Sequence, residues 1–190
     1  MSLNIIENFK DKKLKERIKN KDQQAFEELY DKNADDIYRF IFFKTGKKED
    51  ANDLSSLAFL KTWEHIQKNT LSNRETLRAL LYKITRNVII DHYRSNRQES
   101  ISLDVEENKI DVADENIDIE SEISTQIDYE ILSKKMMEIK NEYREIVIMR
   151  YVNELSLDEI AEITGKKKMN VRVLLHRAIK ALKDVVGERD

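Results

Sequence analysis

Apolar residues recur every three or four positions along most of the chain, which is the spacing of helices with one buried face. Residues 3–18 show the first such pattern. A clearer pattern begins after Asp22, a helix-capping residue, and continues through residues 25–42. It stops at Gly46, because glycine readily adopts the left-handed conformation that ends a helix. The first quarter of the chain therefore predicts two helices.

A third helical pattern covers residues 51–66, and two further leucines, Leu57 and Leu60, lie outside its narrow apolar stripe. The wider apolar surface fits either a partner protein or a broader internal core. The polar residues 67–74 predict a surface loop, in which Ser72 and Asn73 are helix-start signals. A fourth apolar pattern follows over residues 77–88, so four helices are expected before the middle of the chain.

The C-terminal third carries two helical patterns over residues 127–151 and then a more specific arrangement. Ser156 stands three residues before Glu159, the spacing at which each side chain satisfies a free backbone amide at a helix start. A short apolar pattern leads to Gly165, and a longer one covers residues 171–185. A short helix, a glycine turn and a long helix together predict a helix-turn-helix.

Polar and basic residues gather in the turn and along the second helix of this motif. In helix-turn-helix proteins the N-terminal residues of the second helix meet base edges in the major groove, so Asn170 and Arg172 are candidate base-reading residues. A helical hairpin with a solvated, lysine-rich turn is the alternative. The candidates for DNA binding here are Lys166, Lys167, Lys168, Asn170, Arg172, His176 and Arg177.

Composition supports an all-α fold and excludes several other classes of protein. The chain has no proline, three glycines and no cysteine, so a disulfide framework and a thiolate metal site are excluded. No apolar run approaches the roughly 20 residues that span a bilayer, and the charged N-terminus does not resemble a signal peptide. We expect no membrane insertion, a cytoplasmic location and no cofactor.

Charge is distributed very unevenly along the chain. The net charge is -3, but residues 99–130 hold twelve acidic residues and one lysine, so the remainder of the chain sums to +8. The acidic stretch has no sustained apolar period and is expected to be flexible. The sequence therefore predicts two small helical domains, residues 1–98 and 127–190, joined by an acidic flexible linker over residues 99–126.

The fourth predicted helix is basic on its polar faces and carries aromatic residues among the cations. Tyr82, His92 and Tyr93 stand near several arginines and lysines. Cations for phosphates and flat rings for unstacked bases are what single-stranded nucleic acid requires. A solvated basic helix face is the plainer alternative, and the neighbouring helix-turn-helix favours the nucleic-acid interpretation.

Two segments carry a family resemblance. The sequence YREIVIMRYVNELSLDEIAEITG, followed by VRVLLHRA, is similar to the C-terminal domain of the extracytoplasmic-function sigma factors of bacterial RNA polymerase, which recognises the promoter -35 element. The sequence LYKITRNVIIDHYR, residues 81–94, resembles their segment that melts and reads the -10 element. The resemblance covers nearly the whole chain and implies that it binds core polymerase and directs promoter-specific initiation.

The resemblance also implies partners and site residues. Core polymerase would bind through the clamp helices of its largest subunit, promoter DNA would bind both domains, and an anti-sigma factor is implied as a partner. The core-binding segment corresponds to Asp50, Asp53, Leu54, Leu57 and Phe59. The -10 element would be bound by Asn69, Asn73, Arg74, Arg78, Lys83, Arg86, Asn87, Tyr93 and Arg94.

Several positions depart from the family pattern. Ser56 and Leu57 replace a usual glutamine and acidic residue in the core-binding segment, and Val173 and Leu174 replace a small and a basic residue in the recognition helix. A diverged DNA-binding regulator with weak or no polymerase binding is therefore the alternative, and a pure interaction module is a third class. An enzyme is not expected, because three histidines and no glycine-rich phosphate loop offer no convergent catalytic or metal site.

Overall fold

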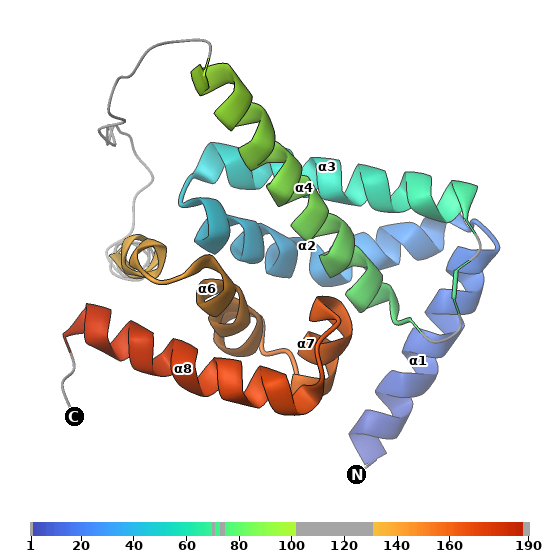
Figure 1. Cartoon of the computed structure of the whole chain (residues 1–190). Helices are drawn as coiled ribbons and strands as arrows, with labels where there is room; N and C mark the ends of the chain where they lie inside the picture. Colours follow the sequence, from blue (N-terminus) through green and yellow to red (C-terminus); the bar gives the residue numbers. More distant parts are fainter. Residues whose placement is uncertain (1, 70, 73–74, 102–130, 188–190) are drawn as a thin grey trace, which may run out of the picture.

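The N-terminal half forms four helices, as the sequence predicts. This computed structural model describes residues 2–69, 71–72, 75–101 and 131–187, and Figure 1 shows the whole chain. The helices are α1 (Ser2–Lys19), α2 (Gln23–Thr45), α3 (Lys48–Lys68) and α4 (Leu77–Ile101). The predicted ends of α2 are confirmed: the Asp22 side chain accepts from the Ala25 amide, and Gly46 closes the helix at φ 76°.

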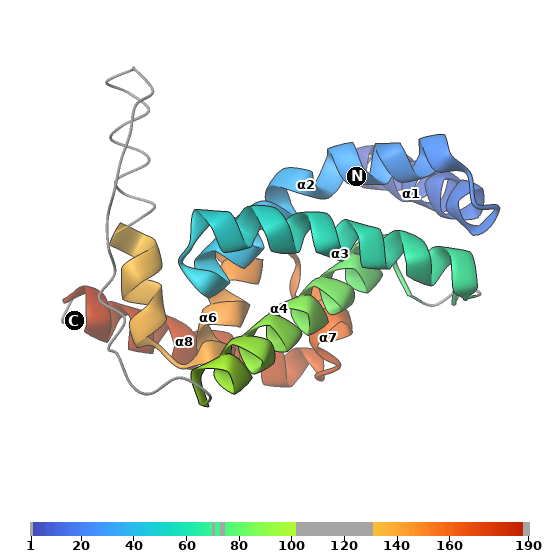
Figure 2. The same cartoon turned by 90° about the horizontal axis from the view of Figure 1, so that it is seen from above.

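Helix α1 meets α2 at a sharp corner, from which the two helices diverge in Figure 1; in the view from above, Figure 2, they overlap. A small apolar cluster fills this corner, where Leu14 and Ile18 of α1 pack with residues of α2, α3, α4 and the loop before α4. Leu71 belongs to this cluster and is buried, although the sequence analysis placed it in a polar surface loop. The loop before α4 is therefore anchored to the N-terminal helices by an apolar side chain.

The start of α4 differs from the sequence prediction. Ser72 precedes the helix, and α4 begins at Leu77 with the Thr76 hydroxyl accepting from the Ala79 amide. Threonine is a good N-cap residue, and this bond satisfies one of the free amides of the first turn. At its other end α4 continues to Ile101, beyond the predicted domain boundary at residue 98. The rest of the predicted linker, residues 102–126, lies outside the described residues.

The C-terminal module contains four helical segments in the predicted order. Residues 131–138 are helical, and α6 (Asn141–Val147) continues into a π-helical turn, η1 (Ile148–Val152). The helix-turn-helix follows as α7 (Leu157–Thr164) and α8 (Lys168–Val186). Helix α8 lies at the edge of the molecule, on the side away from α3 (Figure 1). The all-α prediction is confirmed, with no strand among the described residues.

The two halves share one hydrophobic core. Phe40 of α2 and Tyr82 of α4 belong to the same buried cluster as Met149 of η1 and Val171 of α8. Helix α4 packs on α7, and α2 packs on η1 and α6. Two domains are thus in direct contact here, in a closed arrangement of the N-terminal and C-terminal modules. None of the described helices is long and apolar enough to cross a membrane.

Candidate nucleic-acid interface

The turn of the helix-turn-helix is set by local sequence. Ser156 and Glu159 form the predicted capping box, in which each side chain accepts from the backbone amide of the other residue. Gly165 closes α7 in the left-handed conformation, with φ 67°. Any side chain would be strained at this φ, so glycine fixes the angle at which α8 leaves α7. The predicted helix-turn-helix is confirmed.

Helix α8 presents the predicted -35 residues to solvent. Lys167, Lys168, Asn170, Arg172, His176 and Arg177 are exposed, and Lys166 is half-buried. Lys166 lies 2.9 Å from a Glu142 oxygen, and Lys168 lies 2.6 Å from an Asp158 oxygen. Within the described part of the chain, neither Arg172 nor Arg177 forms an ion pair. The outer face of α8 is therefore a basic surface with free guanidinium groups.

The predicted -10 residues on α4 are placed differently. Arg78, Lys83 and Arg86 are each half-buried and paired with a carboxylate. Asn87 and Arg94 are exposed, and Tyr93 donates its hydroxyl to the Lys44 carbonyl at 2.8 Å. Asn69 is exposed at the end of α3 and donates to the His65 carbonyl at 3.0 Å. Asn73 and Arg74 lie outside the described residues.

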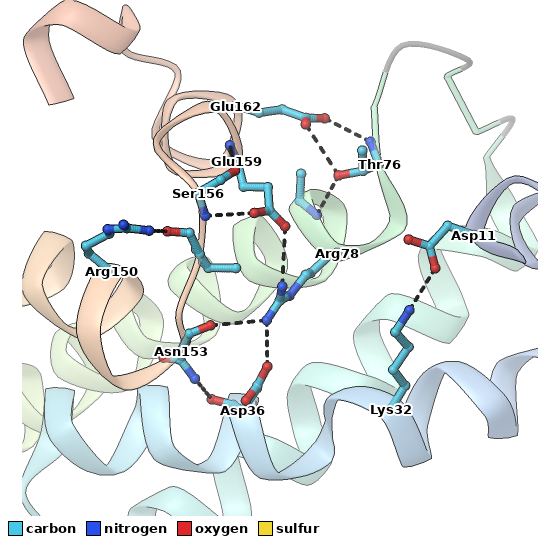
Figure 3. A network of polar contacts seen from close by, with 12 residues as sticks. Asp11, Lys32, Asp36, Thr76, Arg78, Arg150, Asn153, Ser156, Glu159 and Glu162 are labelled. Atoms are coloured by element: carbon cyan, nitrogen blue, oxygen red, sulfur yellow. Dashed lines mark hydrogen bonds and ion pairs between the residues drawn. The ribbon is translucent and has the colours of Figure 1, made fainter. Parts of the chain in front are cut away.

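Arg78 is the centre of a polar network between the two modules (Figure 3). Its guanidinium contacts Asp36 of α2 at 2.7 Å and Glu159 of α7 at 3.3 Å. It also donates to the Asn153 carbonyl at 3.3 Å, and the Asn153 side chain donates to the Asp36 carbonyl at 2.8 Å. One arginine of α4 thus connects α2, the segment after η1 and the start of α7.

A second group of contacts closes the same interface along α4. Glu162 of α7 accepts from the Thr76 amide at 2.8 Å and lies 3.3 Å from the Thr76 hydroxyl. Arg86 pairs with Glu145 of α6 and donates to the Ile163 carbonyl at 3.2 Å. Carboxylates of the C-terminal module therefore form ion pairs with Arg78 and Arg86, two arginines that the sequence analysis assigned to DNA binding.

Two buried cations complete the interface, and the sequence analysis did not identify either of them. Lys44, at the end of α2, is 4% exposed and contacts Asn141 and Glu145. Burial lowers the pKa of Lys44 to about 8, and the neighbouring Glu145 partly offsets that effect. Arg144 is also buried and donates to the Lys44 carbonyl at 3.1 Å and to the Met136 carbonyl at 2.8 Å. Lys44 and Arg144 each stand within an apolar pattern of the sequence, and this position was the signal that could have indicated their burial.

The aromatic residues among the cations of α4 divide into two kinds. Tyr82 is fully buried, and its ring packs edge-on against Phe40. A ring in that position cannot stack on a base, so the nucleic-acid interpretation is wrong for Tyr82. Tyr93 is exposed, and His92 is half-buried with its Nε2 atom 3.2 Å from Asp50.

The predicted polymerase-binding residues on α3 also fall into two groups, one open to solvent and one buried. Asp53 and Leu57 are exposed, and Asp50 is half-buried. Leu54 and Phe59 lie in the hydrophobic core, so the prediction of a direct polymerase contact is corrected for these two: they support α3 from inside. Leu60, which is 54% exposed, extends the outer apolar surface beside Leu57. Ser56 is exposed and donates its hydroxyl to the Asn52 carbonyl.

The described residues offer no competing metal centre, since no three of their His, Asp or Glu side chains gather closely enough to hold an ion.

Two helical modules, one with a helix-turn-helix, define a DNA-binding protein of the all-α class. Sequence comparison agrees: "Sigma-70 region 2" matches residues 29–99, and "Sigma-70, region 4" matches residues 129–182. The chain belongs to the sigma-70 family, in its extracytoplasmic-function group, and is an RNA polymerase sigma factor for transcription initiation.

The individual relatives have low sequence identity to this chain, but the matches cover most of its length. The chain is 29% identical to the ECF sigma factor BldN of Streptomyces coelicolor over 172 residues, 89% of this chain and 63% of that relative. It is 27% identical to the ECF sigma factor SigW of Bacillus subtilis over 180 residues, 90% of this chain and 94% of SigW.

Two solved structures share the fold. CnrH, in complex with the cytosolic domain of CnrY, has a TM-score of 0.72 and 16% identity, with 95% of this chain and 99% of CnrH covered. The sigma factor RpoE of Bartonella quintana, in complex with the anti-sigma factor NepR, has a TM-score of 0.65 and 19% identity, with 88% and 99% covered. At these identities the likeness concerns the fold alone.

Proposed function

We propose that this sigma factor binds core RNA polymerase through α3, reads the -35 element with α8 and binds the -10 element with α4 and the loop before it. We assign these roles to three segments. Residues 1–98 bind polymerase and the -10 element, residues 99–126 are the linker, and residues 127–190 bind the -35 element. One observation carries the proposal: the chain joins a helix-turn-helix with an open basic face to a second basic helix, in the family's order. Each surface suits a different form of the same promoter, duplex or melted.

The docking of polymerase is proposed for the outer face of α3. Leu57 and Leu60 form an exposed apolar pair, and Asp53 adds a charge beside them. Solvent-exposed leucines on a helix that already has a buried face favour a protein partner. Leucine in place of the usual acid at position 57 makes this contact more apolar than in the family pattern.

Promoter binding by α4 requires the closed arrangement to open. Opening takes Glu145 away from Arg86 and Glu159 away from Arg78, which keeps its contact with Asp36 of the same module. We propose that binding to core polymerase separates the two modules, so that α4 meets the -10 strand while α8 holds the -35 duplex. The protein supplies binding free energy for melting, and the polymerase carries out the chemistry.

Partners and location follow from the same proposal. We propose a cytoplasmic protein, because polymerase and promoter DNA are there. An anti-sigma factor is proposed as a regulatory partner, since solved relatives of this fold are in complexes with CnrY and NepR. Such a partner would act by keeping the polymerase-binding face or the basic face of α4 covered.

The proposal is tested by titrating the purified chain against sigma-free core polymerase. We expect a dissociation constant in the nanomolar range, roughly -12 kcal/mol. Leu60→Glu should weaken binding at least about tenfold, because it places a charge in an apolar contact. Ile131→Glu is the matched control, since Ile131 is equally exposed on the C-terminal module.

A Ser56→Gln/Leu57→Glu variant tests the departure from the family pattern. Equal binding by this variant and the wild type means that the apolar face replaces the usual polar contacts. If the wild type does not bind and the double variant does, the proposed polymerase docking is wrong for the natural sequence. Initiation from a promoter recognised by the holoenzyme, measured with and without Arg172→Ala, then tests the -35 assignment.

A further inference from the structure

The outer face of α8 carries two apolar side chains among its basic residues. Met169 is 65% exposed and Val173 is 46% exposed. Both lie in the N-terminal half of the helix, the half that enters the major groove in helix-turn-helix proteins. Neither is used by the packing of the C-terminal module, whose buried residues on α8 are Val171 and Ala178.

Helical geometry places this pair at the middle of the outer face. Residues advance by about 100° each around a helix, so Met169 and Val173 lie about 40° apart. Ala178 lies about 180° from Met169, on the buried side. Arg172 falls on one flank of the apolar pair and Arg177 on the other, and both are exposed. In the first turns of the helix, a ligand that met this face would find an apolar centre between two cationic edges; the exposed His176 and Lys180 continue the same stripe toward the C-terminus.

Duplex DNA has a matching arrangement in its major groove. Phosphates form the two rims, and base edges form the floor, where the C5-methyl group of thymine is the apolar feature. We propose that Met169 and Val173 contact thymine methyl groups of the -35 element and so determine part of its sequence. This inference rests on the proposed function of α8, and it names what the helix reads.

The residue types fit this role. Valine has a rigid branched side chain that suits one fixed methyl group, whereas methionine is flexible and polarizable and adapts to an irregular surface. These two residues can therefore supply readout that does not depend on hydrogen bonds. Each methyl contact should change affinity roughly three- to fivefold, as expected for burying one methyl group.

The test replaces thymine by deoxyuridine, which removes the methyl group and leaves every hydrogen-bonding atom in place. Holoenzyme made from the full chain and core polymerase first selects -35 sequences from a randomised duplex segment upstream of a pre-melted -10 bubble. Each thymine of the selected element is then replaced singly, and dissociation constants are measured. We expect a roughly three- to fivefold loss at one or two positions.

Variants assign the methyl groups to side chains. Met169→Ala and Val173→Ala should each bind thymine DNA as weakly as the wild type binds one of the deoxyuridine duplexes, and each should lose its response at that position. Val186→Ala is the matched control, because Val186 is 50% exposed near the far end of the same helix. All three variants should unfold like the wild type, since each side chain is exposed.

The outcomes separate the inference from the proposed function. Binding that is unaffected by every deoxyuridine, or selection of elements without thymine, overturns the inference and leaves the proposed function intact. Full deoxyuridine sensitivity in both alanine variants also overturns it. A holoenzyme that forms but selects no -35 sequence overturns the proposed role of α8 itself.

Discussion

Helices α4 and α8 carry similar cations, but the two surfaces differ in what those cations contact. On α8, Arg172 and Arg177 point to solvent and have no ion-pair partner among the described residues. On α4, Arg78 and Arg86 are held by Glu159 and Glu145 of the other module. One basic surface is thus ready for a phosphate backbone, and the other must first be uncovered. The same residue types can serve binding in one place and closure in another.

Substitution of the two kinds of arginine should give the largest contrast. Arg78→Met removes two ion pairs and a backbone contact at a partly buried interface, so the free energy of unfolding should fall by about 2–3 kcal/mol. Arg172→Met should change it by less than about 0.5 kcal/mol, because that side chain is exposed. Urea denaturation of both variants measures the difference. Equal effects would contradict a closed interface built on Arg78.

Buried Lys44 should give the interface a pH dependence. Its pKa is lowered from 10.5 to about 8 in the folded protein. Between these values the unfolded chain binds more protons, so the free energy of unfolding should rise with pH, by about 1.6 kcal/mol between pH 8 and 9.5. The slope disappears below roughly pH 7, where Lys44 is charged in both states.

Denaturation at several pH values up to 9.5 measures this slope. Lys44→Met should remove the contribution of Lys44. Lys180→Met, at an exposed position of α8, is the control and should keep the slope. A slope that survives in Lys44→Met would show that another group carries it.

Loss of the interface carboxylates should uncover α4. Glu145→Gln with Glu159→Gln removes the charges of the C-terminal module that contact Arg86 and Arg78, leaves the Asp36 contact of Arg78 in place, and still allows glutamine to complete the capping box at position 159. We expect the free chain to bind single-stranded -10 DNA about fivefold more tightly, the size of a partly exposed ion pair. Fluorescence anisotropy at fixed salt measures this, with Glu138→Gln as a control on an exposed pair. Unchanged affinity would mean that opening does not limit access.

Local features of the sequence were enough to predict the helices and the helix-turn-helix. Asp22, Gly46, Ser156 and Gly165 end or begin helices through contacts with residues at most four positions away, so the sequence contains the whole interaction. The same holds for the outer face of α8, whose residues are exposed because their neighbours in the helix are buried. Prediction succeeded where cause and effect lie in the same element.

The closed interface could not be predicted in that way. Arg144 and Lys44 meet across a hundred residues of sequence, and Asn153 reaches back to Asp36. Nothing in the periodicity of either segment indicates its partner. The burial of Leu71 and Tyr82 has the same cause, since each side chain is covered by helices that are distant in sequence. Tertiary contact decides which members of a basic helix face are available to DNA.

The smallest expected effect concerns the ion pair on the open surface. Lys168 and Asp158 lie 2.6 Å apart, with side chains 47% and 72% exposed. Asp158→Asn should lower the free energy of unfolding by no more than about 0.5 kcal/mol, because water screens exposed pairs. Affinity for a -35 duplex should rise less than about threefold, with a slightly steeper dependence on salt as Lys168 becomes free for a phosphate. A tenfold rise would contradict the difference between α4 and α8. It would mean that a carboxylate limits DNA binding by α8 as well.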